Sequence, residues 1–489
     1  MAVGTKKLDD GIVRKDDILE ASVESLAFGG EGVLRVQSGE KPLVVFVEDV
    51  VPGDKVEIKI GTKKKNFARG YVQKVLSPSK DRIAPHCAHF GQAFEHKRPD
   101  GSAQMSSMKG CGGCVWQFLS LEKQREYKEQ QVRDALKRIG GLDDHGVLPI
   151  LGGDAWFYRN KMEFSFSKTL EGKLTLGLHL RRRHHDVVEL TECHLLEPYA
   201  GKLVEFVRGF FRDFEKNTGF DPELTMKSFT VRVGKNTGEV MMIITAENGE
   251  ENFMASFQKA LLDYCQQRSI PMTSLYFLHI RNKKGSRTVI HEKLIHGSPV
   301  IEETLQIPGG QVLKFQISPQ AFFQPNTKTA ELLYTLALEA ADLTGKETVF
   351  DLYCGTGTIG LFCSSRAAKV YGIELNASAI ANAKQNAQLN TIHNAEFLVG
   401  DVLTELPKLS SSPDVVLVDP PRNGLATGVV ESLANFHPRK IVYVSCNPTS
   451  LARDAAMLVQ RGYRLHSVQP VDQFPHTYHI ECVALFERA

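Results

Sequence analysis

The chain has 489 residues, of which 42% are hydrophobic and 24% charged, and its formal net charge is +2. One hydrophobic core does not extend over this length, so we expect roughly two to four domains. No apolar run reaches the roughly 18 residues that span a bilayer, and residues 1–10 lack the apolar stretch of a signal peptide. We therefore expect a cytoplasmic protein that contacts no membrane.

Residues 14–79 contain short β-type segments separated by glycine turns. The predicted strands cover residues 18–23, 32–36, 43–47, 54–60 and 69–75. Five short strands within some sixty residues are typical of a small closed barrel. We take this segment as the first domain.

Residues 80–310 alternate helices and hairpins. A charged amphipathic helix is predicted at 121–139, with Ser120 as its N-cap and Gly140-Gly141 as its stop. Further helices are predicted at 203–214 and 252–265, and hairpins at 161–167 with 174–180 and at 229–233 with 239–245. This pattern indicates a mixed α+β domain, from which no function follows.

Residues 311–489 change to a strand–helix rhythm. A helix is predicted at 327–341, and strands at 347–352, 369–373, 395–399, 415–419 and 440–444. Alternation of this kind predicts a doubly wound, Rossmann-like parallel sheet. The whole chain is thus expected to be a multidomain α/β protein.

A glycine-rich loop at 351–360 follows the first of these strands and opens a helix. Its glycines let a ligand approach the backbone, and Glu374, which ends the next strand, suits ribose hydroxyls. The pattern also fits a dinucleotide fingerprint. However, Asp351 before the glycines would repel a pyrophosphate, and Asp401 ends the third strand where an adenine amino group can be held. These acids favour S-adenosyl-L-methionine over NAD.

Cys446 lies in a polar Ser-Cys-Asn-Pro turn directly after an apolar run. Asp419 follows the preceding apolar run, and Glu481 lies 35 residues beyond the cysteine. Ligands of open α/β sheets bind at the carboxyl ends of strands. Without a catalytic role, Cys446 would be a small buried packing residue, as most free cysteines are. Glu481 would then be a surface carboxylate on a strand.

Beside a methyl donor, this trio predicts a particular chemistry. A thiolate of Cys446 that adds to C6 of uracil makes C5 nucleophilic toward a sulfonium methyl group. The C5 proton must then leave, for which Glu481 is the candidate base. Asp419 would hold the pyrimidine edge or the cofactor.

Five motifs occur in order at 317–324, 351–357, 419–424, 445–454 and 474–481. Together they resemble the RNA uracil-C5-methyltransferase family, of the TrmA/RumA type. The resemblance implies that Cys446 is the nucleophile and Glu481 the base. It also implies cofactor contacts at Gln324, Tyr353, Thr358, Glu374 and Asp419. Thr358 stands where an asparagine is frequent in that family.

The chain has nine cysteines, an odd number that argues against structural disulfides in a cytoplasmic protein. Cys111 and Cys114 form a CxxC turn, with Cys87 before it and Cys193 after it. Four thiolates suit either zinc or an iron–sulfur cluster. The resemblance to the RumA/RlmD-like branch implies a 4Fe-4S cluster. The interval between Cys87 and Cys111 is longer than usual there, so we expect an inserted loop at 93–110.

Basic residues cluster at 55–82, at 181–185 and at 281–287, and the first cluster holds nine Lys or Arg against two acids. One cluster alone would indicate a solvated surface, whereas three together favour a nucleic-acid partner. The N-terminal barrel resembles a TRAM domain, an OB-like RNA-binding module. A TRAM domain combined with a cluster implies 23S rRNA rather than tRNA as the substrate, and 5-methyluridine as the product. We expect a monomer.

Three other functions remain open from the residues. An NAD- or flavin-linked oxidoreductase would use an iron–sulfur relay and leave Cys446 unreactive. A methyltransferase acting on an exocyclic amine would use the Asp-Pro-Pro turn at 419–421 without a cysteine. An RNA-binding assembly factor would carry out no catalysis.

Overall fold

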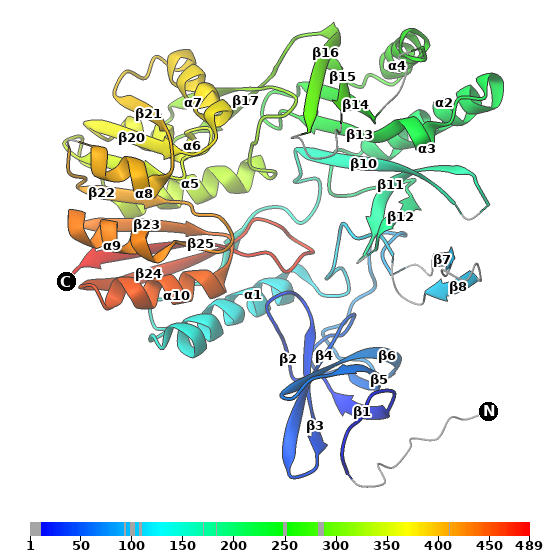
Figure 1. Cartoon of the computed structure of the whole chain (residues 1–489), viewed down its shortest axis with the longest axis horizontal. Coiled ribbons are helices and arrows are strands. Elements are labelled where there is room, and N and C mark those ends of the chain that lie inside the picture. Colours follow the sequence, from blue (N-terminus) through cyan, green and yellow to red (C-terminus); the bar gives the residue numbers. More distant parts are fainter. Residues whose placement is uncertain are drawn as a thin grey trace.

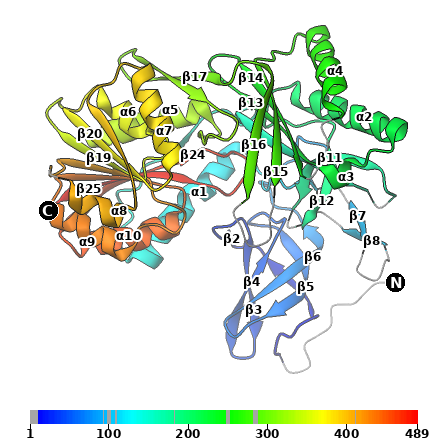
Figure 2. The same ribbon diagram turned by 45° about the horizontal axis from the view of Figure 1, so that its top comes forward.

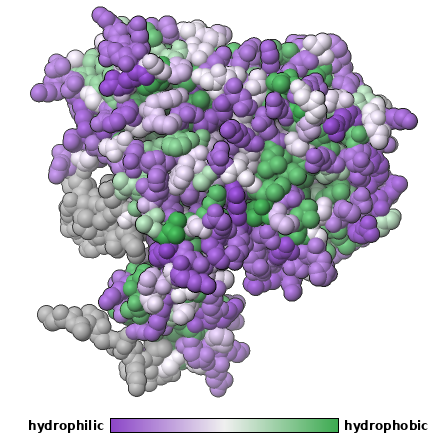
Figure 3. Space-filling model, turned by 180° about the vertical axis from the view of Figure 1, so that it is seen from behind, coloured by the Kyte–Doolittle hydropathy of each residue, from purple (hydrophilic) through white to green (hydrophobic). Residues whose placement is uncertain are grey.

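The computed structural model describes residues 11–91, 94–97, 103–106, 110–169, 171–181, 183–247, 252–281, 288–409 and 411–489. Half of the expected insertion at 93–110 and most of the basic cluster at 281–287 lie outside these residues, as does Arg182. Figures 1 and 2 show a small N-terminal sheet below two larger α/β parts. Seen from behind, the surface is mostly hydrophilic, and hydrophobic residues gather in the middle of the upper body (Figure 3).

The N-terminal sheet has six strands in the order β1-β5-β6-β4-β3-β2. The strands are β1 (Ile18–Ser22), β2 (Ser25–Leu26), β3 (Gly32–Ser38), β4 (Lys41–Val47), β5 (Lys55–Lys63) and β6 (Phe67–Ser77). The two edge strands, β1 and β2, are separated in the chain only by Val23 and Glu24, so one bent segment pairs with both β5 and β3. Valine and isoleucine side chains fill the interior. All five predicted strands are present.

The first helix begins where predicted. The Oγ of Ser120 accepts a hydrogen bond from the Lys123 N–H at 3.3 Å, which caps α1 (Leu121–Ala135). A π-helical turn, η1 (Leu136–Gly140), follows and ends at Gly141, whose φ of 63° lies in the left-handed region. The strands β7 (Phe94–Lys97) and β8 (Ala103–Ser106) form a separate hairpin before this helix.

A seven-stranded sheet forms the middle of the molecule. Its order is β12 (Arg183–Glu189), β11 (Leu174–Leu180), β10 (Lys161–Lys168), β13 (Met226–Val233), β14 (Val240–Glu247), β15 (Ser274–Arg281) and β16 (Val289–Gly297). The helices beside it are α2 (Ala200–Thr218), α3 (Pro222–Thr225) and α4 (Met254–Gln267). A phenylalanine-rich core joins α2 and α4 to one face. The predicted helices and hairpins of this region are confirmed.

The C-terminal sheet has eight strands in the order β21-β20-β19-β22-β23-β25-β24-β9. Its strands are β19 (Thr348–Leu352), β20 (Lys369–Glu374), β21 (Ala395–Val399), β22 (Val415–Val418), β23 (Lys440–Ser445), β24 (Tyr463–Asp472), β25 (Glu481–Arg488) and β9 (Leu151–Gly152). The hairpin β17 (Ile301–Gln306) and β18 (Val312–Ile317) precedes β19 in the chain.

Helices cover both faces of this sheet, as Figure 2 shows. One face packs against α5 (Thr327–Ala341), α6 (Thr358–Ser364) and α7 (Ala377–Leu389). The other packs against α1, α9 (Thr427–Phe436) and α10 (Pro448–Val459), with α8 (Val402–Glu405) and η2 (Leu406–Lys408) on the same side. Residues of β19 alternate between the two cores, since Val349 belongs to the first and Phe350 to the second.

The prediction of a parallel sheet is only partly right, because the observed sheet combines parallel and antiparallel strands. Five strands are parallel, but β25 runs antiparallel to β23 and β24 antiparallel to β25. The sequence conceals β24, because Pro470 stands inside it and its register shifts between Leu465 and Ser467. Among the described residues, no helix combines the length and apolar character needed to cross a bilayer.

A buried ion pair fastens α1 to the C-terminal sheet. The Nζ of Lys128 lies 2.5 Å from the carboxylate of Asp472 at the end of β24, and both side chains are 0% exposed. Lys128 also donates to the carbonyl of Phe474 at 3.1 Å. Although burial lowers the pKa of Lys128, the Asp472 carboxylate opposes this change. The contact ties the start of the 473–480 segment to α1.

Lys128→Met should lower the free energy of unfolding by about 3–5 kcal/mol, because it leaves a buried carboxylate without its main counter-charge. Urea denaturation of the variant and the wild type measures this difference. Lys123→Met is the control on the same helix, since its Nζ pairs with Glu126 at the surface and the expected loss is far smaller. Equal stability of the two variants would contradict the assignment.

Candidate active site

The glycine-rich loop joins β19 to α6. Gly355 and Gly357 have φ values of 55° and 78°, and Tyr353 has the unusual value of 61° for a residue with a side chain. A Cβ atom at Gly357 would lie 2.8 Å from the Phe397 ring, so no other residue fits there without movement. Glu374, at the end of β20, accepts hydrogen bonds from the Gly355 N–H at 3.3 Å and the Asn376 N–H at 2.8 Å. The loop and the predicted ribose-binding carboxylate are therefore adjacent.

The two acids that favoured S-adenosyl-L-methionine have separate positions. Asp351 is buried, and burial raises its pKa to about 7. Its Oδ2 accepts from the Gly360 N–H at 2.9 Å, while its Oδ1 has no partner among the described residues. Asp401 caps α8 by accepting from the Leu403 N–H at 2.8 Å. Asp351 thus holds the glycine loop in place, and Asp401 stands at a helix start.

Sheet register brings Cys446, Asp419 and Glu481 together. β22 and β23 are parallel neighbours, so the residues that follow them, Asp419 and Cys446, emerge at the same edge. β25 is antiparallel to β23 and pairs Cys482 with Ser445. Its first residue, Glu481, is therefore placed at the carboxyl edge beside the cysteine.

The turn that carries Cys446 is fixed by hydrogen bonds. The Asn447 side chain accepts from the Thr449 N–H at 3.0 Å and caps α10, with Pro448 in the first turn. The Nδ2 of Asn447 donates to the Arg422 carbonyl at 2.9 Å. The cysteine turn and the Asp-Pro-Pro turn thus hold each other in position.

Six of the residues predicted from the sequence line a single cavity of about 470 Å³. They are Gln324, Tyr353, Thr358, Asp419, Cys446 and Glu481. Glu374 stands behind the loop, in contact with Gly355, and Asp401 is not among the residues that line the cavity. One opening thus contains the candidate nucleophile, the candidate base and most of the candidate cofactor contacts.

The same cavity contains side chains to which the sequence assigned no role. They are Arg159, Phe322, Tyr334, Arg422 and His479. Phe322 is 66% exposed, which is unusual for a phenylalanine and suits stacking on a planar ligand. Phe322, Arg422 and His479 stand inside the quoted motifs, so a signal for them existed. Arg159 had none, because it precedes β10 and reaches the cavity only through the tertiary fold.

Burial in the cavity opposes the charged forms of its ionisable groups. Burial, together with Asp419, raises the pKa of Glu481 well above its usual value. Burial alone raises the pKa of Asp419 to about 7. Burial, then Glu481 and Asp419, raises the pKa of Cys446 to about 11, against which Arg422 acts. Burial lowers the pKa of His479 to about 4. The free enzyme therefore presents a thiol, which must lose a proton before it can act as a nucleophile.

Alkylation of Cys446 by iodoacetamide should accelerate about tenfold per pH unit between about pH 7 and pH 9, because only the thiolate reacts and its fraction rises below the pKa. Mass spectrometry of the peptide containing Cys446 gives the rate. Arg422→Met should slow labelling at each pH, since it removes the cation that lowers this pKa. A rate that is already level at pH 7 would contradict a raised pKa.

Four cysteines form a second candidate site. Cys87, Cys111, Cys114 and Cys193 surround a small cavity of about 20 Å³. Burial, with contributions from the other three thiols, raises the pKa of Cys111 above its ordinary range. In the described part of the chain, only Asp143, Asp144 and His145 bring three ligand atoms within 4.8 Å of one another. No three of the four cysteine sulfurs therefore lie within 4.8 Å of one another. Four thiolates suit either zinc or an iron–sulfur cluster.

The cysteine segment supports the segment that leads to Glu481. The carbonyl of His476 accepts from the N–H groups of Val115 at 2.7 Å and Trp116 at 3.0 Å, directly after Cys114. The His476 ring stacks on Trp156 with centroids 3.8 Å apart. Gln124 of α1 accepts from the His476 N–H at 2.7 Å. The loop between β24 and Glu481 therefore depends on the cysteine segment for its shape.

Residues 285–405 and 402–489 match the family described as tRNA (Uracil-5-)-methyltransferase. The chain is 35% identical to an uncharacterized RNA methyltransferase of Halalkalibacterium halodurans, over 97% of this chain and 98% of that protein. It is 36% identical to another from Clostridium acetobutylicum over the same shares. The resemblance seen in the five motifs is thereby confirmed.

A solved structure has the same fold throughout. The Pyrococcus abyssi tRNA (uracil-54, C5)-methyltransferase, in complex with S-adenosyl-L-homocysteine, covers 96% of this chain and 100% of its own, with a TM-score of 0.68 and 25% identity. From this fold, the full-length relatives and the family match, it follows that the chain belongs to the uracil-5-methyltransferase family, a group of S-adenosyl-L-methionine-dependent RNA methyltransferases.

Proposed function

We propose that the protein methylates C5 of a uridine in RNA through Cys446 and Glu481, as a monomer in the cytoplasm. The observation that carries this proposal is the common cavity, in which the thiol, the buried glutamate and the glycine-rich loop meet. Gln324, Tyr353, Thr358, Glu374 and Asp419 are the proposed cofactor contacts. Asp401 belongs to this set only if an adenine amino group reaches the start of α8.

S-adenosyl-L-methionine, when bound beside the loop, supplies an electrophilic methyl group. After the Cys446 thiol has released its proton to water, its sulfur forms a bond to C6 of uracil, and the displaced electron pair makes C5 nucleophilic. Once C5 carries the methyl group, the Glu481 carboxylate removes its remaining proton. The electron pair of that C–H bond restores the C5–C6 double bond and expels Cys446. A glutamate whose pKa is raised by burial is well suited to hold this proton.

The target base must leave its stack for this reaction. Cys446 and Glu481 line the cavity, and Glu481 is 6% exposed. A uracil within a duplex cannot reach them, so the substrate is single-stranded or flipped out. The exposed ring of Phe322 at the cavity is the proposed stacking surface for the extruded base.

We propose 23S rRNA as the substrate, on the combination of the N-terminal barrel, which resembles a TRAM domain, with the four cysteines. tRNA is the second candidate. It is favoured by the full-length similarity to the Pyrococcus abyssi enzyme, which is a tRNA (uracil-54, C5)-methyltransferase. Nothing in the family supports the oxidoreductase or the non-catalytic assembly factor that the residues had left open.

Incubation of the protein with labelled methyl donor and separate tRNA and 23S rRNA transcripts tests this proposal. Label at C5 of a uridine in rRNA is the expected result. Label in tRNA alone would overturn the rRNA assignment but keep the chemistry. Label on an exocyclic amine, or no label in any RNA, would overturn the proposed reaction.

The second proposal concerns the four cysteines, which we assign to a 4Fe-4S cluster rather than to zinc. Anaerobically purified protein should be brown and contain about four irons per chain. Cys114→Ser should lower both the iron content and the thermal stability, since Cys114 is buried in the central core. Cys265→Ser, another buried thiol of that core, is the control and should keep the iron. A colourless protein that contains one zinc would contradict the assignment.

A further inference from the structure

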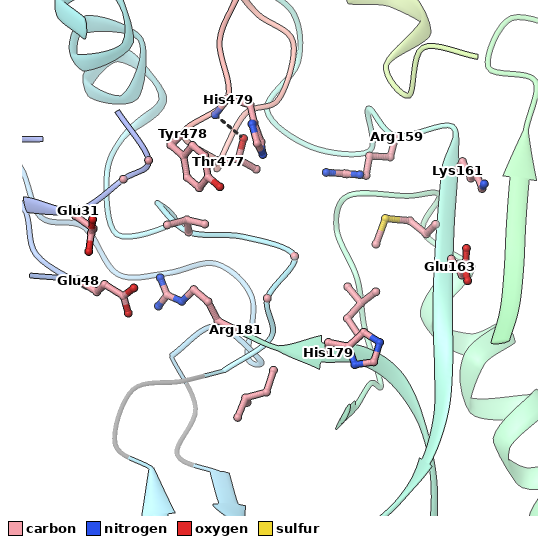
Figure 4. Close-up of a pocket in the computed structure, with 18 residues that line it drawn as sticks. Glu31, Glu48, Arg159, Lys161, Glu163, His179, Arg181, Thr477, Tyr478 and His479 are labelled. Carbon is pink, nitrogen blue, oxygen red and sulfur yellow. Dashed lines mark hydrogen bonds between the residues drawn. The ribbon is translucent and has the colours of Figure 1, made fainter. Parts of the chain in front are cut away.

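The turn between β2 and β3 (residues 27–31) extends from the N-terminal sheet to the segment that leads to the candidate base. Gly30 of this turn lines a cavity of about 670 Å³ together with Tyr478 and His479 of that segment (Figure 4). His479 also lines the active-site cavity. Figure 4 shows the Tyr478 side chain between Glu31 of the turn and His479. The N-terminal sheet is thus continuous with the edge of the active site.

The turn is closed by its own hydrogen bonds and anchored on α1. The Ala27 N–H donates to the Glu31 carbonyl at 2.8 Å, and the Gly30 N–H donates to the Ala27 carbonyl at 3.0 Å. The Nε2 of Gln131, in α1, donates to the carbonyls of Leu26 at 3.3 Å and Ala27 at 3.2 Å. A turn held on both sides in this way keeps its position relative to the C-terminal part of the molecule.

Two residues of the turn contact the segment before Glu481. A Cβ atom at Gly30 would lie 3.2 Å from the Tyr478 ring and 3.3 Å from the ring nitrogen of Trp116. The Phe28 ring meets the Tyr478 ring edge-on, with centroids 6.4 Å apart, as attractive aromatic pairs do. The centroid of the Tyr478 ring is 4.5 Å from that of the next residue. The turn therefore supports the side chain that adjoins His479.

Phe28 also packs against the core on one face of the C-terminal sheet. That core includes Ile480 and Cys482, the neighbours of Glu481 on either side, and both are 0% exposed. Phe28 is half-buried at the margin of this core. Because protein cores are packed at high density, removal of a ring at the margin leaves space into which its neighbours move. The position of Glu481 is thus sensitive to a residue of the N-terminal sheet.

The segment that contains Tyr478 needs contacts from outside to keep its conformation. His476 has a φ of 64°, a value in the left-handed region that is unfavourable for a residue with a side chain. The Thr477 hydroxyl donates to the Phe474 carbonyl at 2.8 Å and accepts from the His479 N–H at 3.2 Å, the dashed line in Figure 4. Such a backbone persists only where its surroundings fix it. α1 and the cysteine segment hold His476, and the turn holds Tyr478.

We propose that the turn between β2 and β3 positions the active site for the reaction. Phe28 and Gly30 hold Tyr478 in place, and Tyr478 in turn fixes His479 and the chain that continues into Glu481. Neither Phe28 nor Gly30 is among the described residues that line the active-site cavity, so they act as positioning residues. The inference rests on the proposed uridine methylation and gives the N-terminal sheet a part in it beyond RNA binding.

Phe28→Ala tests this role in the holoenzyme, with the RNA transcript that the wild type methylates. It should lower kcat about 10–100-fold, because a displacement of about 1 Å in a reacting group has an effect of this size. KM for RNA should change little. Because Glu481 acts after methyl transfer, the methylated covalent adduct should accumulate during turnover and be visible on a denaturing gel. Phe46→Ala is the matched control, since Phe46 is a half-buried phenylalanine of β4 whose ring pairs with Phe67 instead.

Gly30→Ala tests the same contact by adding a methyl group to it. It should lower kcat in the same direction as Phe28→Ala, because the added carbon displaces Tyr478. Gly29→Ala is its control and should keep kcat. Gly29 has a φ of 109°, so alanine is strained there too, but no atom of the described residues lies within 4 Å of its Cβ position. The two variants thus differ in the contact and not in the kind of backbone strain.

Intrinsic fluorescence gives a second readout that does not depend on activity. The chain has two tryptophans, and both lie at this contact region. Trp116 adjoins Gly30, and Trp156 stacks on His476 with centroids 3.8 Å apart. The emission of folded Phe28→Ala and Gly30→Ala should therefore differ from that of the wild type, whereas Phe46→Ala and Gly29→Ala should match it.

A wild-type kcat with a raised KM in Phe28→Ala would make the turn a contact for RNA and overturn the inference. Equal losses of kcat in Phe28→Ala and Phe46→Ala would also overturn it, since they would reflect only the stability of the N-terminal sheet. In both cases the wild type still methylates uridine, so the proposed function stands. A wild type that methylates no RNA would overturn the proposed function and the inference with it.

Discussion

Cys446→Ala should abolish uridine methylation, with kcat lowered roughly 10⁴-fold or more, because no other group in the cavity can form the bond to C6. The other thiol that lines the cavity, Cys354, is held protonated by burial, which raises its pKa far beyond the neutral range. Affinity for RNA should change little, since the removed atom is small and half-buried. Single-turnover assays with labelled methyl donor measure the effect.

Cys265→Ala is the control for Cys446→Ala, because Cys265 lies in the core of the central sheet, away from the cavity. It should keep nearly full activity at a temperature where it is folded. Undiminished methylation by Cys446→Ala would contradict the account and favour transfer to an exocyclic amine, a reaction that needs no cysteine.

Glu481→Gln should stop the reaction after methyl transfer. Without a base for the C5 proton, Cys446 cannot leave, so a covalent protein–RNA species that contains the transferred methyl group should accumulate. Turnover should fall by about 10²–10⁴-fold, the usual contribution of a positioned base. Denaturing electrophoresis with doubly labelled donor and RNA shows whether both labels migrate with the protein.

Glu487→Gln, in the same strand β25 but at its far end, is the matched control and should turn over normally. If Glu481→Gln released methylated RNA at the wild-type rate, another group would have to remove the proton. Failure to form any adduct would instead place Glu481 in the first step, as a partner of the Cys446 thiol.

Most of the active site could be predicted from the sequence, because its residues follow strand ends. In a parallel sheet those ends share one edge, so Asp419 and Cys446 had to be neighbours once β22 and β23 were recognised. The residues made Glu481 a candidate base and the resemblance supported it, but its place beside Cys446 could not be derived, because it depends on the antiparallel β25. The pairing of β24 with β25 could not be predicted from alternating apolar and polar residues, because Pro470 and an irregular register interrupt that pattern in β24.

Long-range packing explains what the sequence did not predict. α1 and β9 lie at 121–135 and 151–152, within the expected central domain, yet both pack on the C-terminal sheet. The buried pair of Lys128 with Asp472 is one reason, and neither residue carries a local signal of its partner. Arg159 was missed for the same cause, because the other residues that line the active-site cavity with it are remote from it in the chain.

The covalent bond between residue 446 and a pyrimidine is the central claim, and 5-fluorouridine RNA tests it most directly. A fluorine at C5 cannot leave as a proton does, so the reaction should stop with RNA joined to the protein through a bond that survives denaturation. Proteolysis and mass spectrometry should then place the nucleotide, with its added methyl group, on Cys446. A trapped nucleotide on another residue, or free fluorinated RNA beside normal methylation of uridine RNA, would contradict the account.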